Sequence, residues 1–334
     1  RNNRWNRTVW GYEKSFTTTS IEFFWPANPI DNTAPTLNNV SINSNNIISS
    51  YVKVGQLVTL TFTSSEAIQT PIVTIGGQAA SVSGSRTSWT ATVSTTSSFT
   101  EGILPFSITY TDFSDNSGTQ VTSTTDSSAV TFDMTAPSAP VITAANATTV
   151  VGTAEGTSTV KVYASDGITL LGSGTADGNG NYNVTLNSSQ TNGATIKVSS
   201  TDAAGNVSSL TTGTVDALPP TLTALTISSD NATTTLAKVG DVVTVNFTAS
   251  ESIQTPTVTI GGIGATVSNT SGNNWTATAA MASSVSSGLI PFTVDYTDLS
   301  GNAGTQVTST TNSSTVTFDK TAPSLTAVTI SSNN

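Results

Sequence analysis

The chain repeats itself, and this repetition limits what it can fold into more than any other feature. Residues 102–137 and 288–323 are identical at 25 of 36 aligned positions, without a gap. Residues 53–77 recur in the same way at 238–262, and a different segment lies between the two copies. A unit of roughly a hundred residues exceeds the ~20–50 residues of a solenoid repeat, so each copy must bury a core of its own. We therefore expect separate modules in tandem.

Apolar residues alternate with polar ones wherever a period is clear, which is typical of β-strands. In residues 57–62 the side chains of Val58, Leu60 and Phe62 share one face, and the copy at 242–247 repeats this pattern. Glycine, asparagine and aspartate collect between such segments, as they do in turns. About seven short strands in about a hundred residues predict an antiparallel β-sandwich of immunoglobulin type.

The predicted fold is all-β, with tandem immunoglobulin-like antiparallel β-sandwiches arranged end to end. Trp89 and Trp275 each lie in an alternating strand, and we expect both to pack in a core. Because residues 321–334 restate residues 33–46, we expect this chain to be a window cut from a longer array. The predicted parts are an aromatic-rich N-terminal segment (1–30), a first module (31–133), a middle module of another subtype (134–216), a third module that duplicates the first (217–319), and the start of a further repeat (320–334).

Composition excludes several classes of function. Cysteine and histidine are absent, and the formal net charge is −10. Without these residues the chain cannot build a Ser-His or Cys-His catalytic pair or an ordinary zinc or haem site, so we expect no enzyme. Nucleic-acid binding depends on clustered lysine and arginine, which an acidic chain of this kind lacks. No apolar run reaches about 18 residues, so we expect no membrane span.

Several acidic residues are expected in turns at one end of each sandwich. In a seven-stranded sandwich, the turns after the second and sixth strands lie at the end where the chain enters, beside the preceding linker. Three carboxylates meeting there would repel one another unless a hard cation lay between them, and Ca²⁺ prefers such oxygen ligands. We therefore predict a candidate calcium site at each module junction. The candidate ligands are Asp31, Glu66 and Asp112 for the first module, Asp133, Asp166 and Asp202 for the middle module, Asp216, Glu251 and Asp298 for the third, and Asp319 after it.

Short motifs recur at the junctions and in the turns. The pattern Asp-x-Thr-Ala-Pro begins at Asp31, Asp133 and Asp319, and Thr-Asp-x-x-Gly-Asn occupies residues 201–206 and 297–302. On these motifs, the chain from about Asp31 to Asn334 resembles the bacterial Ig-like repeats of large secreted adhesins and cell-surface proteins. The resemblance implies an extracellular location at the bacterial cell surface and linkers stiffened by calcium. The ligands that it implies most directly are Asp133, Asp202, Asp216 and Asp319.

The same acids also have a purely structural interpretation. Aspartate and asparagine side chains form hydrogen bonds within turns, and asparagine tolerates a left-handed backbone. A linker aspartate before Thr-Ala-Pro can instead set the direction in which the chain leaves, because proline restrains its neighbour. Asp115 replaces glycine in the turn of the first module, where it either adds a ligand or only tolerates a positive φ. The sequence leaves both interpretations open.

Residues 1–30 differ in composition from the rest of the chain. They hold three of the five tryptophans (Trp5, Trp10 and Trp25) and four of the ten basic residues. Aromatic side chains at this density need to be buried somewhere. The segment is the tail of a preceding module or a cap, a strand donated to a neighbouring subunit, or a surface that stacks against carbohydrate.

These observations favour a structural role. We expect a stalk segment of a large bacterial adhesin or surface filament, which projects a distal binding region and adjoins further repeats of the same chain. One alternative is a self-polymerising filament subunit that uses residues 1–30 as an inter-subunit strand and so binds other copies. Another alternative is a glycan-binding accessory region of a secreted protein.

Overall fold

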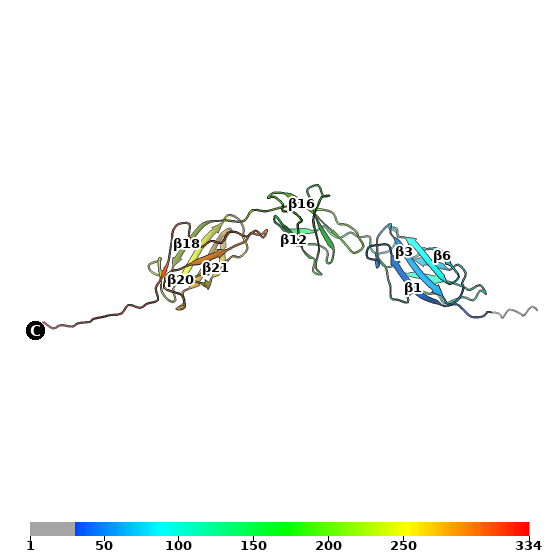
Figure 1. The fold of residues 1–334 in the computed structure, drawn as a ribbon, viewed down its shortest axis with the longest axis horizontal. Coiled ribbons are helices and arrows are strands. Elements are labelled where there is room, and N and C mark those ends of the chain that lie inside the picture. The colour runs from blue at the N-terminus through cyan, green and yellow to red at the C-terminus, as the bar shows by residue number, and fades with distance from the viewer. Residues whose placement is uncertain (1–30, 334) are drawn as a thin grey trace, which may run out of the picture. The chain divides into compact units, whose positions relative to one another are not determined.

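The structure, a computed structural model, describes residues 31–333, which form β-strands joined by turns and loops (Figure 1). Each sheet is built from strands of one predicted module, and most strand pairs are antiparallel. Within residues 31–333 there is no helix long and apolar enough to span a membrane. The prediction of an all-β fold of immunoglobulin-like sandwiches is confirmed, while the module boundaries stay a prediction.

The third module contains three sheets. Its strands are β18 (Leu222–Ser229), β19 (Leu236–Ala237), β20 (Val242–Ala249), β21 (Thr257–Ile260), β22 (Ile263–Gly264), β23 (Thr266–Ser271), β24 (Asn274–Ala280), β25 (Gly288–Leu289), β26 (Phe292–Asp295) and β27 (Thr317–Phe318). The strand orders are β18-β20-β24-β23, β22-β21-β26 and β19-β27-β25. β19 and β27 pair in parallel. This short parallel pair is a feature that alternation alone cannot predict.

Alternation along the strands places one face of each in the core of the third module. Val243, Val245 and Phe247 of β20 are buried, while the residues between them are more accessible. Phe247 lies opposite Trp275 of β24 in the antiparallel register, and both belong to the same apolar cluster. Trp89 of the first module is buried as well, so the prediction that both tryptophans pack in a core is confirmed. Burial of an aliphatic or phenylalanine side chain such as Val245 or Phe247 contributes about 1.5–3 kcal/mol.

The first module repeats these strands at matching positions. They are β1 (Leu37–Ser44), β2 (Tyr51–Val52), β3 (Leu57–Ser64), β4 (Ile72–Ile75), β5 (Gln78–Ala79), β6 (Ser81–Ser85), β7 (Ser88–Ser94), β8 (Gly102–Ile103), β9 (Phe106–Thr109) and β10 (Thr131–Phe132). The orders β1-β3-β7-β6, β5-β4-β9 and β2-β10-β8 correspond one to one with those of the third module. β2 and β10 again pair in parallel. The predicted inward residues of β3, which are Val58, Leu60 and Phe62, are buried.

The middle module is a shorter sandwich of two sheets. Its strands are β11 (Val141–Ala145), β12 (Thr149–Thr153), β13 (Thr159–Ala164), β14 (Leu170–Thr175), β15 (Asn181–Thr185), β16 (Thr195–Thr201) and β17 (Thr211–Thr214). The strand orders are β11-β12-β15 and β14-β13-β16-β17, with β12 and β16 labelled in Figure 1. Val150, Val160, Tyr182 and Ile196 come from different strands and form part of one buried cluster.

A buried tyrosine explains why a particular glycine follows it in both copies. Tyr296 is 6% exposed, and the backbone of Leu222 forms a hydrogen bond with its hydroxyl group. Gly304 packs against the ring so closely that a Cβ atom would lie 2.2 Å from Tyr296 Cε2. Tyr110 and Gly118 have the same relation in the first module. Glycine is required at these two positions by lack of space for a side chain and not by backbone conformation, because neither glycine has a positive φ.

Replacement of Gly304 by alanine should destabilise the third module. The added methyl group overlaps the Tyr296 ring, and overpacking of this kind costs about 1–3 kcal/mol. Differential scanning calorimetry of the full chain should show one transition moving to lower temperature. The matched control is Gly264→Ala, because no atom lies within 4 Å of the Cβ position there. Equal melting of the two variants would contradict the proposed packing role.

Candidate functional site: acidic residues at the entry of each module

An aspartate and an asparagine close the turn that follows β26. Asp298 Oδ1 accepts a hydrogen bond from the backbone N–H of Asn302 at 2.8 Å, and its Oδ2 accepts from Asn302 Nδ2 at 2.8 Å. Gly301 lies between them with φ +89°, a conformation that glycine adopts without steric cost. Asp298 is only 1% exposed, so the turn holds a nearly buried carboxylate. The motif Thr-Asp-x-x-Gly-Asn is therefore a turn former, as its structural interpretation requires.

The same asparagine also fixes the linker that leads into the module. Asn302 Nδ2 donates a hydrogen bond to the backbone oxygen of Asp216 at 2.9 Å. The middle module repeats this bond from Asn206 to Asp133 at 3.1 Å, and in the first module Asn116 Nδ2 donates to the oxygen of Asp31 at 2.9 Å. One amide group thus joins the turn carboxylate and the linker backbone in each of the three modules. The sequence analysis missed this role of the asparagine, although its place at the end of each turn was a visible signal.

The linker aspartates share a second local interaction. In each, Oδ1 accepts a hydrogen bond from the backbone N–H two residues later, which leaves the second carboxylate oxygen available. The four acceptors are Asp31 (3.0 Å), Asp133 (3.0 Å), Asp216 (3.3 Å) and Asp319 (2.9 Å). The linker aspartates therefore shape the chain locally, whatever else they bind.

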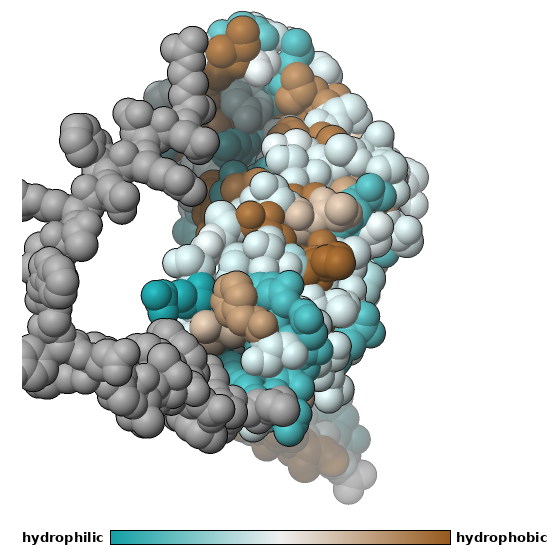
Figure 2. Space-filling view, turned by 90° about the vertical axis from the view of Figure 1, so that its right-hand side faces the viewer, coloured by the Kyte–Doolittle hydropathy of each residue, from teal (hydrophilic) through white to brown (hydrophobic). Residues whose placement is uncertain are grey.

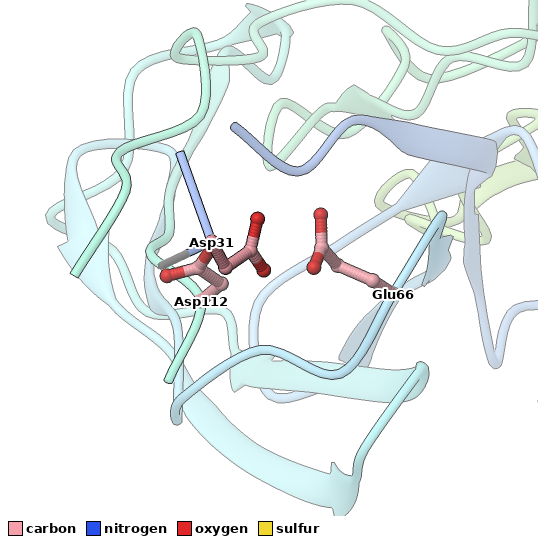
Figure 3. Close-up of side chains that lie close together, drawn as sticks. All are labelled: Asp31, Glu66 and Asp112. Atoms are coloured by element: carbon pink, nitrogen blue, oxygen red, sulfur yellow. The ribbon is translucent and has the colours of Figure 1, made fainter. Parts of the chain in front are cut away.

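A glutamate completes an acidic set in each of the two copies. Glu251, just after β20, lies with Asp216 and Asp298 so that one carboxylate oxygen of each is within 4.8 Å of the others. In the first module, Asp31, Glu66 and Asp112 form the same arrangement within 4.8 Å. Figure 3 shows Glu66, which follows β3, on the opposite side of the group from the two aspartates. The structure thus brings together both sets that the sequence analysis proposed for the duplicated modules.

Crowding of like charges contributes to the raised pKa values of the two glutamates. Burial and then the charges of Asp31 and Asp112 raise the pKa of Glu66 above its ordinary value. Burial and then the charges of Asp216 and Asp298 raise the pKa of Glu251 in the same way. A cation bound beside either glutamate would offset the charge repulsion there.

The turn aspartate of the first module behaves in the opposite way. Burial alone would raise the pKa of Asp112, but hydrogen bonds from Asn116 and from the backbone N–H of Ser114 together outweigh it, so the pKa lies below the ordinary value. In the triad of the first module, hydrogen bonds thus favour the charged form of Asp112, while burial and the neighbouring charges oppose the ionisation of Glu66.

The middle module has a looser set, and one of its members differs from the prediction. Asp133 and Asp202 are close enough to interact, because the charge of Asp202 contributes, after burial, to a raised pKa of Asp133. The third acid beside them is Glu155, whose pKa is raised first by burial and then by Asp202 and Asp133. Glu155 follows β12, the second strand of the module, and so takes the place that the sequence analysis assigned to Asp166.

Asp166 lies elsewhere, in the hairpin between β13 and β14. Its carboxylate accepts hydrogen bonds from the N–H groups of Ile168 and Thr169 and from Thr169 Oγ1, and these bonds lower its pKa to about 2. The nearest charge that affects its pKa is Lys197 rather than another acid. The structure therefore does not bring Asp166 into the acidic set. The assignment failed because the turn after the third strand was taken for the turn after the second.

Two further acids named in the sequence analysis lie outside the sets. Asp115 has φ +65° and accepts a hydrogen bond from Gln69 Nε2 at 2.9 Å, so it tolerates the glycine conformation and fixes a neighbouring side chain. Asp319 forms its local turn but belongs to neither of the two triads found within residues 31–333.

The chemistry of the triads fits a hard divalent cation. All three groups are carboxylates, which Ca²⁺ prefers over nitrogen or sulfur ligands. Asp298 uses two of about four lone-pair positions for Asn302, and Asp216 uses one for Leu218, so both retain acceptor capacity. Within residues 31–333, the acids that could hold an ion in the first and third modules are Asp31, Glu66, Asp112, Asp216, Glu251 and Asp298.

Removal of the Asn302 amide should loosen the entry of the third module. Asn302→Ala leaves the backbone oxygen of Asp216 and one oxygen of Asp298 without this donor, which we expect to lower stability by about 1–3 kcal/mol. Limited proteolysis should then cut the linker near residue 217 faster, and calorimetry should show a lower transition. Asn273→Ala in the hairpin between β23 and β24 is the control. If both variants resist protease as the wild type does, the amide does not hold the linker.

Stability should depend on pH in two opposite ways when divalent cations are absent. Glu66, Glu155 and Glu251 have raised pKa values in the folded state, so their unfavourable contribution at neutral pH disappears as pH falls toward about 4.5. Asp166, with a folded pKa of about 2, contributes stability that is lost as pH falls below about 3.8. Melting in chelator should therefore rise on mild acidification and fall below pH ~4. A variant with glutamine at all three glutamates should keep the fall and lose most of the rise, the remainder coming from Asp133, whose pKa is also raised. A rise as large as in the wild type would show that the glutamates do not cause it.

Residues 136–217 match the model of the bacterial Ig domain. No curated protein matches the chain. Similar solved structures include one from a 1.5-MDa bacterial ice-binding adhesin, with 21% identity over 87% of this chain and 100% of that chain and a TM-score of 0.31.

Two other solved structures extend this comparison. The BSP domain of a biofilm-associated protein has 11% identity over 88% of this chain and 68% of that chain, with a TM-score of 0.25. The I9–I11 tandem of titin has 9% identity over 85% of this chain and 98% of that chain, with a TM-score of 0.29. The expectation of bacterial Ig-like repeats is thus confirmed for residues 136–217, which match the bacterial Ig domain family.

Proposed function

We propose that this chain is a stalk segment of an extracellular bacterial surface protein, in which calcium stiffens the linker into each module. The observation that carries this proposal is the triad of a linker aspartate, a strand-end glutamate and a turn aspartate within 4.8 Å in both copies. The match of residues 136–217 to the bacterial Ig domain supports the surface location.

The geometry of the triads explains how calcium would act on the linker. The backbone of Asp216 is already held by Asn302, while its carboxylate stands beside Glu251 and Asp298. A cation shared by these three groups would tie the linker to two separate loops of the module that follows. It would also cancel the charge repulsion that, after burial, contributes to the raised pKa of Glu251. Binding to the folded form alone then adds stability, about 2.7 kcal/mol at a concentration 100 times Kd.

The acidic sets suit ion binding better than glycoside hydrolysis. Hydrolysis by two carboxylates needs a separation of about 5–9.5 Å and one acid in a cleft that holds the sugar. Here three carboxylates instead of two share one position, with one oxygen of each within 4.8 Å of the others, and the turn aspartate is held by its asparagine. We therefore propose a mechanical and not a catalytic role.

The filament alternative depends on residues 1–30. These residues, including Trp5, Trp10 and Trp25, lie outside the part that the structure describes. Self-polymerisation through that segment stays a prediction from the sequence, as does its alternative role as the tail of a preceding module.

The proposal is tested by neutralising the two glutamates with Glu66→Gln and Glu251→Gln. In chelator this variant should melt at the same temperature as the wild type or higher, because like charges have been removed. In calcium it should gain much less than the wild type, since each triad has lost a ligand. Small-angle X-ray scattering should show that calcium extends the wild-type particle and has little effect on the variant.

The matched control is Asp295→Asn, which removes one negative charge from the third module away from the triad. An asparagine oxygen can still accept from Gln306 Nε2, as Asp295 Oδ1 does at 2.8 Å. This control should keep the full response to calcium. If wild type and glutamine variant respond alike, or if neither responds, the triads are not calcium sites and the proposed stiffening is wrong.

A further inference from the structure

An open groove lies on the first module, apart from the acidic triad. It has a volume of about 660 Å³ and is bounded by the loop after β3, the β6–β7 hairpin and the turn that begins at Asp112. In the face drawn in Figure 2, hydrophobic residues form separate brown spots among hydrophilic ones rather than one continuous patch. Its lining includes Gln69, Thr70, Ser85, Arg86, Trp89 and Phe113.

Arg86 stands at a position that favours glycine. It is the first residue of a two-residue hairpin loop closed by the pair Ser85 and Ser88, and its φ is +57°. Gly272 occupies the equivalent position in the third module with φ +52°. A left-handed conformation costs free energy for arginine and almost none for glycine. The first module therefore carries an arginine against the local backbone preference.

The backbone around Arg86 is fixed by its neighbours. Its carbonyl oxygen accepts hydrogen bonds from the N–H of Ile68 at 3.0 Å and from Trp89 Nε1 at 3.1 Å. In the third module, the equivalent Trp275 Nε1 has no partner. These two bonds hold the turn that carries the exposed guanidinium group. Within residues 31–333, Arg86 is the one arginine, and its guanidinium forms no ion pair or hydrogen bond there.

Phe113 gives the groove an exposed aromatic ring. Its side chain is 72% exposed, although it sits beside the buried Asp112 in the turn. The copy has the aliphatic Leu299 at this position, also largely exposed. The Gln69 side chain donates two hydrogen bonds through Nε2, to Asp112 O and Asp115 Oδ1, which leaves its amide oxygen as an acceptor. Thr70 and Ser85 add exposed hydroxyl groups.

We propose that this groove binds a carboxylated sugar ring of an acidic glycan. The C–H face of a pyranose ring packs against the Phe113 ring, and the planar guanidinium of Arg86 binds the sugar carboxylate with two parallel hydrogen bonds. Arg86 is the one charged residue that lines the groove, so it supplies the charge complementarity. Hydroxyl groups of the sugar find partners in Thr70, Ser85 and the Gln69 oxygen. A purely acidic peptide would offer the carboxylate without this ring of hydroxyls.

The duplicated module supplies the test variants. Arg86→Gly and Phe113→Leu each restore the residue of the third module, so neither should unfold the chain, and Arg86→Gly relieves backbone strain. Isothermal titration of the full chain would use trigalacturonate and 3′-sialyllactose as carboxylated probes, with lactose as the neutral probe. We expect binding of one or both carboxylated probes, at least ~10-fold weaker in either variant, and no detectable lactose binding. The two probes distinguish a uronate from a sialate as the source of the carboxylate.

A gain of function completes the test. Gly272→Arg together with Leu299→Phe should give the third module the same preference and double the number of sites. The proposal is overturned if neither carboxylated probe binds, if Arg86→Gly binds as the wild type does, or if lactose or an oligoglutamate peptide binds equally well. Unchanged melting of the variants confirms that any loss is local. This inference does not depend on calcium or on the proposed stalk function.

Discussion

One side-chain amide connects the local turn, the linker and the acidic set in each module. Asn302 closes its turn onto Asp298 and at the same time holds the backbone of Asp216. Because the linker is fixed here, its carboxylate reaches the turn and meets Glu251 from another loop. Without that amide, three like charges would have no reason to stay together. The hydrogen bonds therefore hold three carboxylates close enough to repel one another, and a divalent cation would offset this repulsion.

The strands were predictable because their cause is local. Alternation of Val243, Val245 and Phe247 selects one face, and a two-residue period cannot be satisfied by a helix. Other features depend on distant pairing and could not be predicted. The parallel pairing of β19 with β27 joins residues some eighty positions apart, and no pattern within either segment specifies it. The close approach of Gly304 to Tyr296 likewise becomes visible only when the chain is folded.

The acidic sets were predictable to the extent that strand order was known. Glu66 and Glu251 follow long alternating strands that are easy to recognise, so their place in the sandwich could be deduced. In the middle module the strands are shorter, and the hairpin at Asp166 resembled a strand-end turn. Hydrogen bonds from Thr169 and, to a smaller extent, the charge of Lys197 hold the Asp166 carboxylate in its charged form, whereas Glu155 stands beside Asp202. For a carboxylate in a turn, the sequence thus predicts hydrogen-bond donors within the same turn, but not which acid from another loop will lie beside it.

Because the first and third modules are duplicates, a residue in one can be compared with the equivalent residue in the other. Two modules with the same strands and the same triad share the constraints of folding, so differences between them have other causes. Gly272 shows what the hairpin backbone prefers, and Arg86 departs from it at the rim of a groove. The same comparison gives Asp115 a structural role and not a binding role. It also replaces a glycine at positive φ, but its carboxylate is held by Gln69 and serves the turn itself. A departure from the copy is informative about binding only where the new side chain has no partner within its own module.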